Sequence, residues 1–185
     1  MPQIFRFVIL IPHRDVRGLL EKMRAKLFSA GFYGAYSFPP AAPLLRVSRP
    51  FSREELKEFA RNIRSTVNEN KGKILSSAPA AIHCPGALSF FGPRLNLPVD
   101  EVIIPRPAET KILQRLSPPL LCAALVQAEN DPVPETVIAS DAAALSFRAG
   151  ALANLSIRPL RPLDGEETAY SFEWKIGPAV WMPRD

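Results

Sequence analysis

The chain has 185 residues, of which 47% are hydrophobic and 22% are charged, so it is long enough to bury the core of an ordinary globular protein. Its 23 Lys and Arg residues outnumber its 18 Asp and Glu residues, but they form no dense basic run of the kind that marks a nucleic-acid patch. The N-terminal apolar run lacks a basic flank and a cleavage site, and no run approaches the about 18 residues that a membrane span needs. We therefore expect a cytoplasmic protein that has no membrane segment.

The cysteines and histidines give no metal-binding pattern. Cys84 and Cys122 each lie in an apolar run and form no CxxC motif, which predicts buried free thiols in a reducing compartment. The two histidines, His13 and His83, lack nearby convergent carboxylates or thiolates that would complete the three or four ligands of a zinc site. We expect neither a metal nor a cofactor, and the sequence does not give the oligomeric state.

The chain begins with a predicted strand and a predicted helix. "QIFRFVILIP", residues 3–12, is rich in β-branched and aromatic residues and closes at a proline, as a buried strand does. Residues 13–32 carry apolar side chains at helical spacing, and Gly31 is placed to end that helix.

A second strand and a second helix follow a proline-rich connector. "LLRVSRPF", residues 44–51, predicts a short strand bounded by prolines. Ser52 and Glu55 have the spacing of a capping box, so a helix is expected to begin at Phe51 or Ser52 and to reach about Asn70.

The middle of the chain changes character. Residues 73–104 show little helical period and many turn residues, which predicts three or four short strands. Residues 107–116 predict a short helix, and residues 118–130 fit either a buried strand or a helix. Residues 131–141 predict a loop that includes a brief helix.

The last part predicts strands again. Residues 144–160 and 169–181 are strand-like and are separated by "RPLDGEET", whose Asp-Gly pair favours a β-hairpin. The 20 prolines are dispersed between elements instead of forming a linker. We therefore expect one domain over residues 1–185, with a waist near residues 93–108.

A short pattern occurs twice, at residues 44–51 and at residues 154–160. Each copy is an alternating strand that ends in Arg-Pro and an apolar residue. Alternation places on one face Leu44, Arg46 and Ser48 in the first copy, and Asn154, Ser156 and Arg158 in the second. The duplication suggests two related lobes whose polar faces meet across a cleft that could hold an anion.

The order of these elements, with "RPF" before "SREEL" and a late strand followed by "SFEWKIGPAVWMPR", resembles the two-histidine phosphoesterase superfamily of 2′-5′ RNA ligase-like and cyclic phosphodiesterase proteins. The resemblance implies an α+β fold of two pseudo-symmetric lobes, with antiparallel sheets around a central cleft and helices packed outside. Each lobe of that family contributes one His-x-Thr/Ser strand to the cleft.

Both motif histidines of that family are missing here. In the first copy, one register places Leu44 at the histidine position and Arg46 at the hydroxyl position, and a register two residues later places Arg46 and Ser48 there. In the second copy, Asn154 stands at the histidine position and Ser156 at the hydroxyl position. The chain is therefore expected to be a degenerate member with no catalytic residue that can be assigned.

The missing histidines favour binding over catalysis. Hydrolysis of a cyclic phosphodiester needs a proton acceptor and a proton donor, and the loss of one such group typically costs about 10² to 10⁴ in rate. An asparagine does not titrate, and an arginine acts only as an anion clamp. We expect a non-catalytic protein that binds a nucleotide or an RNA end through its phosphate, with Arg46, Ser48, Asn154, Ser156 and Arg158 as the hypothetical ligand-binding residues.

Two alternatives stay open. In the first, the protein is an active enzyme on cyclic or 2′-5′ phosphodiesters that has recruited His13 or Glu173 as a base and Arg46 as a phosphate clamp. In the second, it is a structural or protein-interaction module whose cleft is filled by side chains such as Leu44.

Overall fold

A computed structural model describes residues 4–32, 35, 38–69, 74–84, 88–122, 124–127, 135–143, 146–159 and 172–182. The described residues form four helices and two antiparallel sheets, so the predicted α+β class is confirmed. In chain order the elements are β1 (Phe5–Pro12), α1 (Arg14–Ser29), β2 (Ala42–Val47), α2 (Arg53–Glu69), β3 (Ile74–Cys84), β4 (Leu88–Leu95), α3 (Arg106–Glu109), β5 (Ile112–Arg115), β6 (Ala124–Gln127), α4 (Glu135–Ala143), β7 (Ser146–Phe147), β8 (Ala149–Pro159), β9 (Phe172–Ile176) and β10 (Val180–Trp181).

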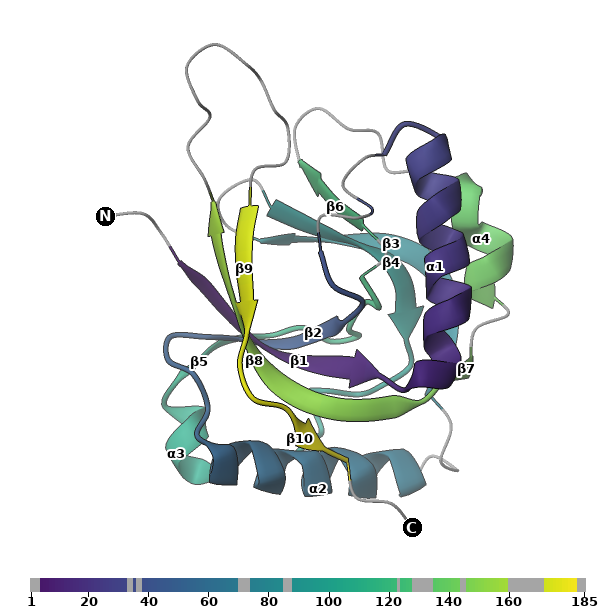
Figure 1. The fold of residues 1–185 in the computed structure, drawn as a ribbon. Helices are drawn as coiled ribbons and strands as arrows, with labels where there is room; N and C mark the ends of the chain where they lie inside the picture. The colour runs from purple at the N-terminus through teal and green to yellow at the C-terminus, as the bar shows by residue number, and fades with distance from the viewer. Residues whose placement is uncertain are drawn as a thin grey trace.

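The first sheet is built around β1. Its strand order is β10-β8-β1-β2-β5, and β9 extends the same edge by pairing with the other end of β8. The pairing of β1 with β8 runs from Phe5 opposite Ile157 to Pro12 opposite Ala149. The two strands that carry the duplicated pattern, β2 and β8, therefore lie in one sheet with β1 between them (Figure 1).

The second sheet has the order β6-β4-β3-β7 and is joined to the first at both edges. On one side, the segment 116–122 bonds to both sheets, because Leu116 N–H donates to Leu44 O at 2.8 Å and Leu121 N–H donates to Pro93 O at 2.9 Å. On the other side, only Arg148 separates β7 from β8. The two sheets thus form one barrel-like wall (Figure 1).

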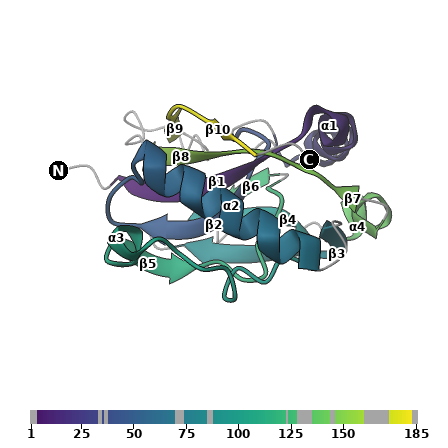
Figure 2. The same cartoon turned by 90° about the horizontal axis from the view of Figure 1, so that it is seen from below.

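Apolar side chains cover both faces of the first sheet. On the inner face, the rings of Phe7 and Phe90 meet edge to face with centroids 5.2 Å apart, and Phe38 packs on the same ring. On the outer face, Val8 and Leu152 belong to a second buried cluster that includes the apolar stripe of α2. Figure 2 shows α2 lying across β1, β2 and β8.

The two long helices lie where the sequence predicts them, and α2 begins at Arg53, one residue after Ser52. Ser52 N–H donates to Glu55 Oε2 at 2.6 Å, and Glu55 N–H donates to Ser52 Oγ at 3.2 Å, which confirms the capping box of α2. His13 caps α1 by accepting from Asp15 N–H, and Gly31 has a φ of 94° just beyond the end of that helix. This left-handed conformation favours glycine, so the predicted stop is confirmed.

The middle of the chain corrects two expectations and resolves a third. Residues 74–95 hold two long strands, β3 and β4, instead of several short ones, because they pair with each other from Ser76 opposite Leu95 to Cys84 opposite Leu88. In residues 107–116 the helix stops after α3, and β5 follows, because its backbone pairs with the edge of β2. The ambiguous residues 118–130 include a strand, β6.

Other expectations have mixed outcomes. The brief helix expected in residues 131–141 is confirmed by α4, and the hairpin is confirmed by the antiparallel pairing of β8 with β9. The Asp164-Gly165 turn lies outside the described residues. The two pseudo-symmetric lobes with a central cleft, and the waist near residues 93–108, stay predictions. No helix in the described part of the chain is long and apolar enough to cross a membrane.

Candidate anion-binding pocket

A cavity of about 330 Å³ opens on the outer face of the first sheet, where β1 begins and β8 ends. Its floor comes from β1 and β8, one side from β9 and the residues after it, and another side from Pro50 in the turn before α2. The helix α2 lies across β1, β2 and β8 (Figure 2), and the pocket includes Pro50, which precedes the N-terminal end of that helix.

Three polar side chains lie in one row across the pocket floor. Arg6 of β1 pairs with Ser156 of β8, and Ser156 pairs with Lys175 of β9. Residues that are directly opposite on neighbouring strands point to the same face of a sheet. Because neighbouring strands are about 4.8 Å apart, the Cα atoms of Arg6 and Lys175 are about 10 Å apart with the serine hydroxyl between them.

The two cations of this row have no internal counter-ion. Within the described residues, no carboxylate lies within ion-pair distance of Arg6 or Lys175, and Arg6 Nη1 makes only a long 3.5 Å contact with Ser48 O. On the next row of the same face, Arg158 Nη1 lies 3.9 Å from Glu173 Oε2. These two charges offset each other, so the described pocket residues carry a net positive charge.

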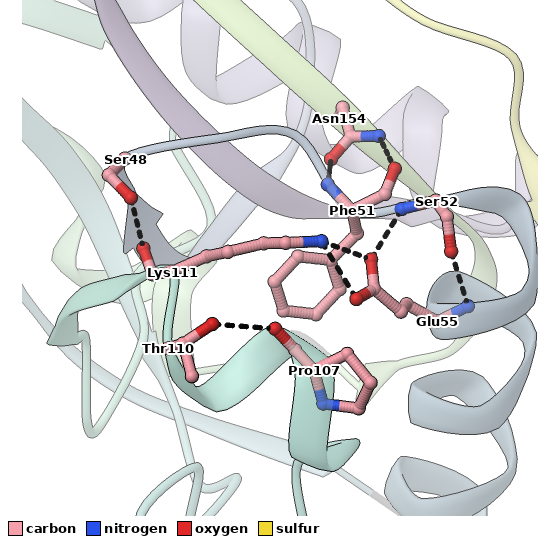
Figure 3. A network of polar contacts seen from close by, with 8 residues as sticks. All are labelled: Ser48, Phe51, Ser52, Glu55, Pro107, Thr110, Lys111 and Asn154. Atoms are coloured by element: carbon pink, nitrogen blue, oxygen red, sulfur yellow. Dashed lines mark hydrogen bonds and ion pairs between the residues drawn. The ribbon is translucent and has the colours of Figure 1, made fainter.

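Asn154 fixes one wall of the pocket. Its Oδ1 accepts from Phe51 N–H at 2.8 Å, and its Nδ2 donates to Phe51 O at 2.8 Å (Figure 3). The carboxamide thereby pairs with the main chain as a neighbouring peptide would. These two hydrogen bonds hold the turn that includes Pro50 against β8.

A second contact holds the same turn from the other side. Lys111 Nζ donates to both carboxylate oxygens of Glu55 at 2.8 Å, and Ser48 Oγ donates to Lys111 O at 3.2 Å (Figure 3). Burial alone would raise the pKa of Glu55, but the hydrogen bonds from Lys111 and Ser52 outweigh burial and hold that pKa below its ordinary value. The turn before α2 is therefore tied to β8 and to the start of β5.

The five residues expected to bind the ligand do not all converge. Asn154 and Ser156 line the pocket. Arg158 lies one row away and contacts Glu173. In the first copy, Ser48 donates its hydroxyl to the main chain, as described above. The alternation expected in the second copy is confirmed, since Leu155 and Ile157 are buried on the inner face.

Arg46 lies on the opposite face of the sheet from this pocket. It pairs with Phe7, whose side chain belongs to the inner cluster, and its guanidinium carbon lies 5.9 Å from the centroid of the Phe5 ring. A bulge in the β1–β2 pairing interrupts the alternation of β2, so the sequence neighbours Leu44 and Leu45 are both fully buried.

Sequence reasoning missed Arg6 and Lys175. Arg6 is the only charged residue in the apolar run "QIFRFVILIP", and Lys175 alternates with the aromatic residues of "FEWKI". Each was visible as a charge in a predicted strand, but their common row depends on the register of three strands that come from distant parts of the chain.

The proposed replacement bases do not line this pocket. His13 lies seven residues from Arg6 at the far end of β1, about 23 Å away at the rise of an extended strand. Glu173 contacts Arg158 instead of facing the cavity. The side chains of His83 and Cys84 lie outside the described residues, and the side chain of Cys122 is buried. Among the side chains described, no group of three His, Cys, Asp or Glu residues could hold a metal ion.

Comparisons with known proteins leave the pocket as the main ground for a functional proposal. No protein-family model matches the sequence. No curated protein and no solved structure matches it either.

Proposed function

We propose that this protein binds a phosphate-bearing ligand, such as a nucleotide or an RNA end, in the pocket between β1, β8 and β9. The observation that carries the proposal is the row of Arg6, Ser156 and Lys175, in which two cations flank a hydroxyl with no described carboxylate in contact. Hydrogen bonds from a guanidinium or an ammonium to a phosphate are among the strong ones in proteins. The cavity of about 330 Å³ is at the lower end of the range for small-molecule sites.

The lining of the pocket supports binding without acid–base catalysis. The described residues that line it include no histidine, cysteine, aspartate or glutamate. Hydrolysis of a cyclic phosphodiester needs groups that take up and release a proton near neutral pH, and an arginine does neither. Asn154, at the histidine position implied by the resemblance, gives its carboxamide to Phe51. The proposal thus retains a non-catalytic protein with the two-lobed fold of the two-histidine superfamily. It assigns phosphate binding to the cations Arg6 and Lys175 in place of Arg46.

Isothermal titration calorimetry with AMP and with a trinucleotide that carries a terminal phosphate tests the binding. We expect Arg6→Ala to weaken binding by about 10- to 100-fold, the value of a charge-assisted hydrogen bond, and Lys175→Ala to have an effect of the same order. Arg46→Ala is the matched control, because it removes the same charge from the opposite face of the same sheet.

The outcomes distinguish a site in the pocket on the outer face of the sheet from a site on the inner face, near Arg46. Loss of affinity in Arg6→Ala with normal affinity in Arg46→Ala supports this pocket. Loss in Arg46→Ala alone would move the site to the inner face. No binding of either ligand by the unmodified protein would make the proposal wrong.

An activity assay tests the non-catalytic part. We expect no turnover of 2′,3′-cyclic nucleotides or of 2′-5′ linked oligonucleotides by the purified protein. Turnover that disappears in both Arg6→Ala and Asn154→Ala, in preparations that remain folded, would instead support the alternative of an active enzyme.

A further inference from the structure

We infer that the pocket selects the dianion of a terminal phosphomonoester over a phosphodiester, an inference that rests on the proposed function. The pocket row carries two positive charges, from Arg6 and Lys175, with no described counter-ion in contact. A phosphomonoester carries about 1.5 to 2 negative charges at pH 7, whereas a diester carries about one. Only the monoester balances both cations.

The number of donor groups leads to the same choice. The row offers three donors, the guanidinium of Arg6, the hydroxyl of Ser156 and the ammonium of Lys175. A monoester has three terminal oxygen atoms to accept from them, and a diester has two. Because Ser156 lies midway between the two long side chains, a phosphate above its hydroxyl is within reach of both.

The charged residues that the structure describes around the row do not change this balance. Arg158 and Glu173 come from β8 and β9 on the next row of the same face and lie 3.9 Å from each other. Of the other residues that line the pocket, Ile4, Pro50 and Pro178 carry no charge. These apolar side chains are left to contact the organic part of the ligand.

The preference for the monoester should depend on pH because the phosphate of the ligand itself titrates. The second ionisation of a phosphomonoester has a pKa of about 6, so its dianion is scarce at pH 5 and dominant at pH 8. A methyl ester of the same phosphate keeps one charge across this range. The ratio of the two affinities cancels any titration of the protein, since both ligands meet the same protein at each pH.

The experiment measures the affinity of the full chain for AMP and for its methyl ester, adenosine 5′-(methyl phosphate), by calorimetry at pH 5 and pH 8. We expect AMP to bind at least about tenfold more tightly at pH 8, the effect of one additional charge contact near a protein surface, and the ratio to approach one at pH 5. In Lys175→Ala, the ratio at pH 8 should fall towards one while the ester still binds. Arg46→Ala should retain the full ratio.

Four results would overturn the inference. Equal affinities at pH 8, or an affinity ratio that does not change with pH, would show that binding does not depend on the second negative charge of the phosphate. The proposed function would still stand in that case. A full ratio in Lys175→Ala would assign the selection to other residues. Failure of both ligands to bind would reject the proposed function itself.

Discussion

Two polar groups of residues lie on the outer face of the first sheet, and they differ in where their hydrogen bonds go. In the turn network, Ser52 N–H and Lys111 Nζ donate to the carboxylate of Glu55 at 2.6 and 2.8 Å. The carboxamide of Asn154 forms two hydrogen bonds of 2.8 Å with the backbone of Phe51. In the pocket row, Arg6 and Lys175 make no such close contact among the described residues. The comparison teaches that polar groups bonded to other protein groups hold the chain in place. Polar groups with no close protein partner among the described residues remain available to a ligand.

The largest expected effect is the loss of the carboxylate from the turn network. Glu55→Ala removes the partner of the largely buried Lys111 and uncaps Ser52 N–H, so we expect the free energy of unfolding to fall by about 3 kcal/mol. Urea titration measures this change. Glu54→Ala is the matched control, because its exposed carboxylate pairs only with Lys57 along the helix surface. Equal losses of unfolding free energy in Glu55→Ala and Glu54→Ala would show that the turn network does not hold the chain in place more strongly than a surface ion pair does.

A somewhat smaller loss is expected for Asn154→Ala. The variant leaves the N–H and the C=O of Phe51 without their partner, which should lower the free energy of unfolding by about 2 kcal/mol. Ser156→Ala, two residues along the same strand, should change stability little because its hydroxyl makes only a 3.5 Å contact. If Ser156→Ala were as destabilising, the pocket row would also be part of the scaffold.

The pH dependence of stability gives a third test. Because the pKa of Glu55 in the folded protein lies below its ordinary value of 4.5, the unfolded chain binds the proton more readily. The contribution of Glu55 to stability is therefore complete above about pH 4.5 and is lost as pH falls through the lower, folded pKa. In urea titrations between pH 3 and pH 7, the difference between the unmodified protein and Glu55→Gln should shrink as the pH falls. A constant difference would contradict this assignment.

The smallest effect is expected next to the pocket row. Arg158 and Glu173 are half-exposed, and their charged atoms are 3.9 Å apart. Arg158→Ala should therefore change stability by less than about 0.5 kcal/mol. It should also retain most of the affinity for AMP, since Arg158 does not line the pocket. A loss of affinity as large as that of Arg6→Ala would extend the binding site to this row.

Local features of the fold could be predicted from the sequence because they depend on residues close together in the chain. The capping box follows from the spacing of Ser52 and Glu55, and the end of α1 follows from Gly31. The common polar face of Asn154, Ser156 and Arg158 in β8 follows from simple alternation. Each of these needs only one element to be read correctly.

The candidate site could be predicted only in part because it depends on registers between distant strands. Asn154 and Ser156 were found within one strand, but Arg6 and Lys175 join them only through pairings across β1, β8 and β9. Uninterrupted alternation from residue 44 predicts that Arg46 shares the face of the site. The bulges in the pairings of β2 with β1 and β5 break that alternation, and no local pattern signalled them.

The central position of β1 has a consequence for how the molecule is made. Residues 5–12 are synthesised about 140 residues before one of their two neighbouring strands, residues 149–159. Until then the apolar side chains of β1 lack half of their sheet, and they must be kept from other partners. Closing such a long loop is slow in folding terms, so the first sheet is expected to form late, after local elements such as α2. The nascent chain is thus most exposed to misassembly in the interval between the synthesis of β1 and the synthesis of β8.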